Sequence, residues 1–135
     1  MTTGRPQVIV VDAANVIGSR PDGWWRDRPG AARRLLTKLA VLQHHLQDTT
    51  DIIVILEGAA RAAVSGPDAP DTGDLSVVLA PGSGDDTIAS VTAESTAQPN
   101  TPEVTVVTAD RGLRQRIEPT GATPVGTRWL LDQLD

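Results

Sequence analysis

Five short runs of aliphatic and β-branched residues recur along the chain, and they restrict its fold more than any other feature of the sequence. A continuous run without alternating polar residues is typical of a strand covered on both faces, as in a parallel sheet. Four runs span Gln7 to Val11, Ile52 to Leu56, Leu75 to Leu79 and Val104 to Val107, and a weaker fifth spans Ala122 to Val125. We therefore predict five strands.

Helical patterns fall between these runs. From Ala31 to Gln47 leucines recur at helical spacing, with Pro29 suited to the first turn and Asp27 suited to cap it. Further helices are expected from Gly84, after Asp110 and from Thr127, and loops are expected from Ala59 to Asp74 and from Ala97 to Pro102. Strands alternating with helices predict an α/β fold with a central, mostly parallel five-stranded sheet flanked by helices.

Length and composition exclude several classes of protein. The 135 residues suit a single domain, residues 1–135, and the absence of cysteine excludes a disulfide framework and thiolate metal sites. The net charge of −5 argues against nucleic-acid binding by a broad basic surface. No apolar run approaches the ~20 residues of a membrane span, and the polar start does not resemble a signal peptide, so we expect a cytoplasmic protein without membrane contact.

Acidic residues follow four of the five predicted strands. Asp12 and Glu57 come directly after the first and second strands, Asp85 and Asp86 follow the third, and Asp110 follows the fourth. Sites in open α/β sheets form outside the carboxyl ends of the strands, so these acids are expected to gather there. Because gathered carboxylates repel and their oxygens suit hard cations, the pattern predicts a Mg²⁺ or Mn²⁺ site that activates water against a phosphoryl group.

Each acid also has a structural interpretation. Asp12 is suited to cap a turn, Asp110 to cap the third helix, and Glu57 to be a solvated loop acid. Ser83 and Asp86 have the capping-box spacing, in which Ser83 caps the helix and Asp86 reaches back, and this favours a structural role for Asp86. Capping explains one helix start at a time, however, and does not explain acids after four separate strands.

Basic and aromatic residues cluster after Asp12. Guanidinium groups hold phosphates in bidentate fashion, and a tryptophan face stacks an unpaired base for ~1–3 kcal/mol. We therefore predict a substrate-binding segment, with at least one of its two tryptophans packed structurally. Its members are Arg20, Trp24, Trp25, Arg26 and Arg28, and Arg111, Arg114 and Arg116 either extend this basic rim or form a charged helix face.

Three segments resemble the NYN domains of the YacP type, which are PIN-like ribonucleases. Residues 8–18 (V-I-V-V-D-A-A-N-V-I-G) are similar to a strand that runs into D-x-x-N-V-I-G. Residues 84–88 (G-D-D-T-I) resemble the acidic helix start of that family, and residues 106–113 (V-V-T-A-D-R-G-L) resemble its T-x-D-x-x-L segment. Together with Gly121 and Ala122, these segments cover nearly the whole chain in the family's order.

This resemblance implies a PIN-like three-layer fold and a metal-dependent endoribonuclease, which in some members acts on RNA at the ribosome. By position, Asp12, Asp85 and Asp110 would bind the Mg²⁺ or Mn²⁺, and Asn15 would order the site or touch the substrate. Glu57 stands where many members have Asp and is a further candidate ligand. We expect single-stranded RNA as substrate, a catalytic set that includes Asp86, and the ribosome as a candidate partner.

Two other functions remain open. The acidic net charge and a chain shorter than many YacP-type members also fit an inactive PIN-like module that binds RNA or protein. Metal-dependent phosphatases and phosphate-accepting signalling domains likewise carry an Asp after the first strand. However, Asp12 is followed by two alanines instead of D-x-D-x-T, and no lysine follows the fifth strand as in receiver domains.

Overall fold

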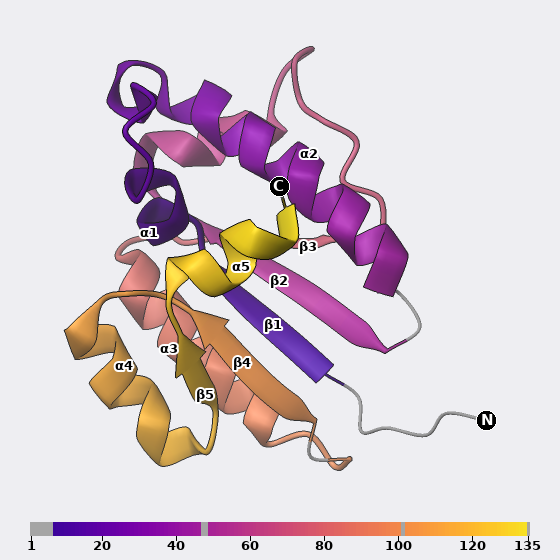
Figure 1. Cartoon of the computed structure of the whole chain (residues 1–135), viewed down its shortest axis with the longest axis vertical. Helices are drawn as coiled ribbons and strands as arrows, with labels where there is room; N and C mark the ends of the chain where they lie inside the picture. The colour runs from indigo at the N-terminus through magenta and orange to yellow at the C-terminus, as the bar shows by residue number, and fades with distance from the viewer. Residues whose placement is uncertain (1–6, 47–48, 101, 135) are drawn as a thin grey trace.

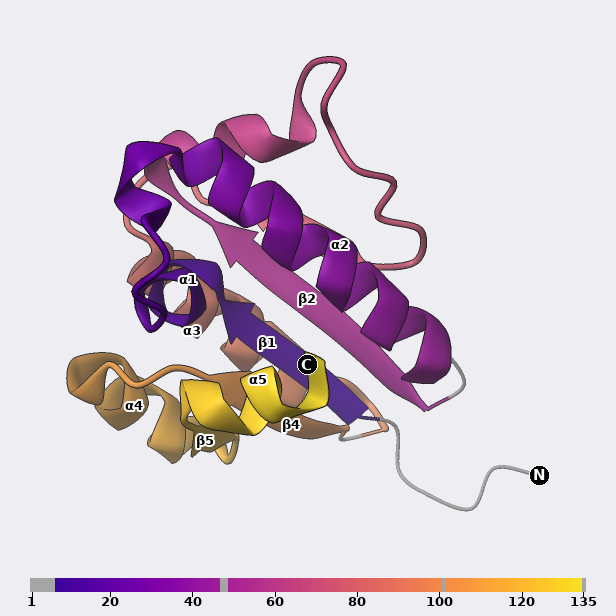
Figure 2. The ribbon, with the colours of Figure 1, turned by 45° about the horizontal axis from the view of Figure 1, so that its top comes forward.

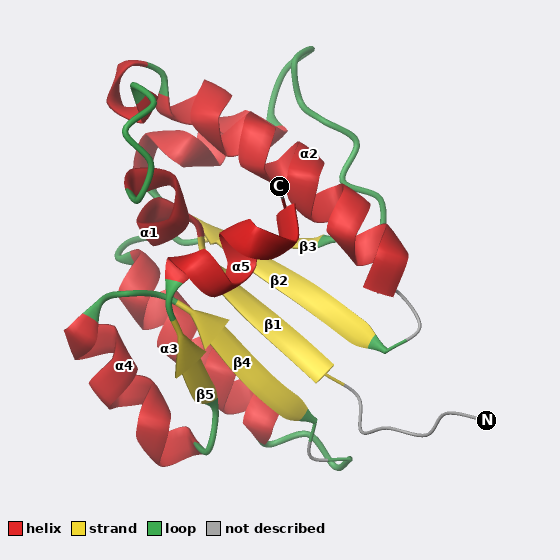
Figure 3. Ribbon diagram, in the orientation of Figure 1, coloured by secondary structure: helices red, strands yellow, loops and turns green. Residues whose placement is uncertain are grey.

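Five parallel strands form a single sheet in the order β3-β2-β1-β4-β5 (Figures 1 and 3). The structure is a computed structural model that describes residues 7–46, 49–100 and 102–134. The strands are β1 (Gln7–Asp12), β2 (Thr50–Leu56), β3 (Ser76–Leu79), β4 (Glu103–Val107) and β5 (Thr123–Val125). The predicted mostly parallel sheet is thus confirmed and, over the described residues, is parallel throughout.

Helices cover both faces of the sheet and complete three layers (Figure 2). The α-helices are α1 (Ala13–Gly18), α2 (Arg28–Leu46), α3 (Gly84–Thr96), α4 (Arg111–Ile117) and α5 (Thr127–Leu134). The 3₁₀ helices are η1 (Trp24–Arg26), η2 (Gly58–Val64) and η3 (Glu118–Thr120). In the described part of the chain, no helix has the length and apolar character that a membrane crossing needs.

The alternation of side chains along the strands produces two hydrophobic cores. On one face, Ile9 and Val11 of β1 pack with Leu36 and Leu39 of α2 and Leu130 of α5. On the other, Val10 and Ile55 pack with Ile88, Leu113 and Ile117 of α3 and α4. Because both faces are covered, the strands carry continuous apolar runs.

A side chain completes the hydrogen bonding of β2 where its neighbour β3 is too short. β3 pairs with β2 only from Ile53 onward. Before that point, the Gln43 amide donates to Thr50 O at 2.7 Å and accepts from Ile52 N at 2.7 Å. Gln43 is 2 % exposed, so the amide replaces a strand partner inside the protein.

The predicted helix around residues 31–47 begins earlier, at Arg28, with Pro29 in its first turn. Its cap is confirmed, since Gly30 N donates to Asp27 Oδ1 at 2.9 Å. The end predicted at Gln47 lies outside the described residues, as do Met1–Pro6 and Thr101. Four elements were not predicted. They are α1, directly after β1, the short η1 and η3, and η2, which stands where a loop was expected and packs against α2.

Candidate active site

The predicted acidic residues meet at the carboxyl edge of the sheet, near the point where the chain order reverses between β1 and β4. Asp12 ends β1, Glu57 follows β2, Asp110 follows β4, and Asp85 lies in the first turn of α3. Asp85 and Glu57 act electrostatically on Asp12, and Asp110 and Glu57 act on Asp85. Four acids from separate segments of the chain therefore form one electrostatic group, which we call the acidic cluster.

Asp12 is the most buried member of the acidic cluster. Only 5 % of the residue is exposed. Thr108 Oγ1 donates to its Oδ2 at 2.9 Å, and Asn15 N donates to its Oδ1 at 3.3 Å. Asp12 therefore also caps α1, where one interpretation had expected it to cap a turn. Burial, and to a smaller extent Asp85 and Glu57, raise the pKa of Asp12 from 3.8 to about 6, although the two hydrogen bonds oppose the rise.

Hydrogen bonds tie the loop after β4 to α1. The Thr108 hydroxyl accepts from Asp110 N at 3.1 Å, and Asn15 Oδ1 accepts from Ala109 N at 2.8 Å. Asp110 also caps α4, because its Oδ1 accepts from Leu113 N at 2.9 Å. Asn15 thus orders the loop that carries Asp110. Thr108 was quoted in the T-x-D segment, but its contact with Asp12 was not foreseen.

The capping box predicted at the start of α3 is wrong. The Ser83 side chain makes no capping hydrogen bond, although Ser83 occupies the N-cap position. Instead Glu57 supplies the acceptor, since Gly84 N donates to its Oε2 at 2.8 Å. Glu57 is therefore half-buried and bonded, where a solvated loop acid was one interpretation.

Asp86 points to a different partner from the one predicted. Its Oδ1 lies 3.0 Å from Arg116 Nη1, and this pair joins α3 to α4. The neighbouring Asp85 has a raised pKa, first because of burial and then because of Asp110 and Glu57, while Arg116 lowers it. Asp85 is thus the acid of this helix start that belongs to the acidic cluster.

The oxygen donors of the acidic cluster match the ligands that Mg²⁺ and Mn²⁺ prefer. Like-charge repulsion and two raised pKa values also favour a cation beside them. Among the described residues, however, no three Asp, Glu or His side chains converge as a ready metal site. Hydrogen bonds to Asp12, Glu57 and Asp110 use part of the acceptor capacity of their carboxylates, and the remaining capacity is what a cation would use.

Part of the predicted substrate-binding segment adjoins the acidic cluster. The Trp24 and Trp25 rings are perpendicular with centroids 5.9 Å apart, and the Arg28 and Arg26 guanidiniums lie 5.5 and 5.8 Å from their respective centroids. Trp25 is 53 % exposed, whereas Trp24 is half-buried and faces Gly18, as expected for one structural tryptophan. Trp24, Arg28 and Glu57 line one pocket of about 360 Å³, which we call the Trp24 pocket.

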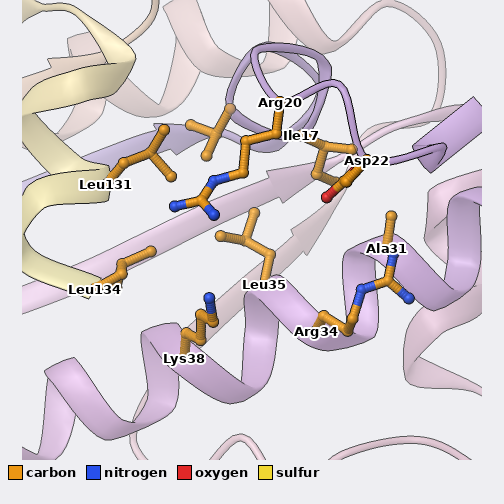
Figure 4. Close-up of a pocket in the computed structure, with 10 residues that line it drawn as sticks. Ile17, Arg20, Asp22, Ala31, Arg34, Leu35, Lys38, Leu131 and Leu134 are labelled. Carbon is orange, nitrogen blue, oxygen red and sulfur yellow. The ribbon is translucent and has the colours of Figure 1, made fainter.

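Arg20 lies in a different pocket from Trp24. Figure 4 shows it across Leu35 from Arg34 and Lys38 of α2, with Leu131 of α5 at one side of the same pocket. This second pocket, of about 100 Å³, lies between α1, α2 and α5. Ile17 lines both pockets, so α1 separates them. The segment predicted as one binding surface is therefore divided between two.

The arginines of α4 have different surroundings. Arg111 begins the helix and is exposed beside Asp110. Arg114 Nε donates to Thr108 O at 3.0 Å, and Arg116 pairs with Asp86. Arg114 and Arg116 therefore hold the loop and the two helices together, which leaves Arg111 as the candidate member of a basic rim.

Comparison with known proteins gives matches to solved structures. A scan of protein-family models and a search of curated proteins each found no match. The crystal structure of Rae1 (YacP) from Bacillus subtilis matches with a TM-score of 0.73 and 22 % identity over 94 % of this chain and 72 % of that one. A point mutant of Rae1 matches with a TM-score of 0.75 and 19 % identity over 95 % and 74 %. The chain therefore has the YacP-type, PIN-like fold that its sequence motifs predicted.

Proposed function

We propose that the protein is a metal-dependent endoribonuclease that hydrolyses phosphodiester bonds of single-stranded RNA. The observation that supports this most is the acidic cluster, which joins Asp12, Asp85, Asp110 and Glu57 at the carboxyl edge of a YacP-type fold. The resemblance to YacP-type proteins suggests ribonuclease activity, and the acidic cluster contains side chains suited to that chemistry. A ribosome-bound RNA is the substrate context that the resemblance suggests.

Asp12, Asp85 and Asp110 would hold the Mg²⁺ or Mn²⁺, with Glu57 as an additional oxygen donor. Such an ion, when bound, lowers the pKa of a coordinated water and neutralises charge on the phosphoryl group. The chain contributes position and charge. Thr108 and Asn15 fix Asp12 and the loop of Asp110, and ionised Asp12 is available above its pKa of about 6.

Trp24, Arg28 and the exposed Trp25 and Arg111 would orient the RNA strand. Arginine meets phosphate as a planar cation, and tryptophan stacks on bases of any sequence. These groups provide local attraction for RNA on a chain whose net charge is −5. The expected binding is therefore salt-dependent but confined to this edge of the sheet.

Circular single-stranded RNA provides the sharpest test, because only an endonuclease can open it. The protein is incubated with the circle in Mn²⁺, in Mg²⁺ and in EDTA. We expect linear product with either metal and none in EDTA. Asp12→Asn and Asp110→Asn should abolish cleavage, whereas Asp51→Asn, which changes an exposed acid of β2 outside the acidic cluster, should not. An intact circle under every metal condition would refute the proposal.

A second candidate is an RNA-binding module without catalysis. It is favoured by one observation, that no three acidic side chains of the described residues converge as a ready metal site. In this case the protein should retain labelled RNA on a filter with or without Mn²⁺ and leave it intact. Metal-dependent opening of the circle excludes this candidate.

A further inference from the structure

We propose that the Trp24 pocket is a nucleobase subsite that accepts an unpaired base with an exocyclic amino group, beside the acidic cluster. This inference rests on the proposed function in taking RNA as the ligand. It adds the placement of one nucleotide and a preference among bases. Nothing in the proposed reaction by itself requires either property.

The pocket has a planar aromatic and cationic wall. Trp24 and Arg28 form it together, with the Arg28 guanidinium 5.5 Å from the ring centroid of Trp24. Both groups stack on the π-face of a nucleobase, and the positive charge of Arg28 adds attraction for the attached phosphate. The wall therefore matches a nucleotide better than an aliphatic ligand.

Apart from Ile17 and Glu57, the rest of the lining is small, which leaves space for a flat ring. Ala14, Gly58, Ala60 and Gly82 contribute at most a methyl group each, and the pocket volume of about 360 Å³ lies within the range of small-ligand sites. A Cβ added at Gly82 meets no atom within 4 Å. A larger side chain at this position therefore fits the backbone and occupies space that a base would use.

Glu57 gives the pocket a hydrogen-bond acceptor. The Gly84 N–H at 2.8 Å from Oε2 fixes its carboxylate, which has acceptor capacity beyond this bond. An ionised carboxylate accepts from amino groups such as N4 of cytosine and N6 of adenine. Uracil has no amino group, and its one free ring N–H lies between two carbonyl oxygens that the same charge repels. We therefore expect cytosine and adenine to be preferred over uracil.

The same carboxylate connects the pocket to the acidic cluster. Glu57 acts electrostatically on both Asp12 and Asp85. A base held against Glu57 therefore places its own backbone phosphate near these acids. In this arrangement base preference and cleavage position are linked through one side chain.

The test measures RNA binding by the Asp12→Asn variant, so that no strand is cut during the measurement. Fluorescein-labelled tetranucleotides of cytidine, adenosine or uridine are titrated in fluorescence anisotropy. We expect the cytidine and adenosine strands to bind roughly tenfold more tightly than the uridine strand. Glu57→Gln keeps an acceptor for Gly84 but loses the charge, and it should reduce this preference severalfold.

Two further variants separate the pocket from the general charge of the surface. Gly82→Leu should weaken binding of all three strands roughly tenfold or more by filling the stacking space. Arg34→Ala removes a cation from the same helix as Arg28, but from the second pocket, and should leave the preference for cytidine and adenosine intact. Equal affinity for the three strands, or unchanged affinity in Gly82→Leu, would overturn the inference.

The outcome is distinguishable from that of the proposed function. If the protein opens the RNA circle equally well after changes at Gly82 and Glu57, the proposed nuclease activity stands and the nucleobase subsite is refuted. If the protein leaves the circle intact but binds RNA with a base preference that Gly82→Leu removes, the subsite stands and the nuclease activity is refuted.

Discussion

Thr108 donates its hydroxyl to the Asp12 carboxylate at 2.9 Å, although 96 positions separate the two residues in the chain. The contact forms because β1 and β4 are neighbours and end side by side, with Val11 paired to Val107. The same hydroxyl oxygen accepts from Asp110 N at 3.1 Å. One fully buried side chain thus couples two acids of the cluster.

Thr108→Val should uncouple these two acids. Valine keeps the shape but cannot donate to Asp12 or accept from Asp110 N, and each lost bond to a buried group costs about 1–3 kcal/mol. We expect a lower free energy of unfolding in urea and a pKa of Asp12 above about 6, because the Thr108 bond lowers it. Thr108→Ser retains the hydroxyl and serves as control. Equal stability and an unchanged carboxyl titration in Thr108→Val would contradict this role.

Asp12→Asn should remove a loss of stability that the protein undergoes as the pH rises toward neutrality. Asp12 has a pKa of about 6 when folded and 3.8 as a free side chain, so the folded state binds its proton more tightly. The stability contributed by protonated Asp12 is complete below pH about 4 and lost as the pH rises to about 6, a difference of about 3 kcal/mol. The variant does not undergo this loss.

Urea unfolding of both proteins between pH 4 and 7.5 measures this effect. The free energy of unfolding of Asp12→Asn, relative to that of the parent, should rise with pH and level off above pH about 6.5. Asp51→Asn, at an exposed position, controls for removal of one carboxylate. A difference in the free energy of unfolding that does not change with pH would show that ionisation of Asp12 does not lower the stability of the fold. Mn²⁺ should raise the melting temperature of the parent at pH 7 more than that of Asp12→Asn.

The sheet and the position of the acidic cluster were predictable because both depend on local patterns. Continuous apolar runs mark strands covered on both faces, and acids directly after parallel strands must share an edge. Capping was predictable only where it is local, as for Asp27 and Gly30. At the start of α3, the side chain of Glu57 accepts the hydrogen bond from Gly84 N, and the predicted cap Ser83 makes no such bond. Glu57 lies 27 positions from Gly84 in the chain and reaches it only after folding.

The division of the predicted substrate-binding segment between two pockets was less predictable for a similar reason. Arg20 and Trp24 are close in sequence, but α1 lies between their pockets. No hydrophobic periodicity in the sequence predicted this helix. Its six residues are too few for a helical repeat to be recognised. The burial of Gln43 was not predictable either, because a polar residue within a helix ordinarily indicates the solvent-exposed face of that helix.

Gln43→Leu should strongly destabilise the fold despite the apolar surroundings of the position. The change leaves the carbonyl of Thr50 and the N–H of Ile52 without the amide that now pairs with them, which should cost about 2–4 kcal/mol. The exposed neighbour His44 provides the control, and His44→Leu should change the free energy of unfolding little. Thermal or urea unfolding compares the two. Equal stability of Gln43→Leu and the parent would mean that β2 needs no partner there.

Asp85 and Asp86 are adjacent acids that should differ sharply in function. Asp86 is an exposed partner of Arg116, and pairs of this kind contribute about 0–1 kcal/mol, so Asp86→Asn should change stability little and keep most RNA cleavage. Asp85→Asn removes a member of the acidic cluster and should abolish cleavage. Arg116→Gln should raise the pKa of Asp85 further, since the guanidinium lowers it, and shift the pH profile of cleavage upward. The three variants are compared on circular RNA between pH 5.5 and 8.5, and an Asp86→Asn variant as inactive as Asp85→Asn would return Asp86 to the catalytic set.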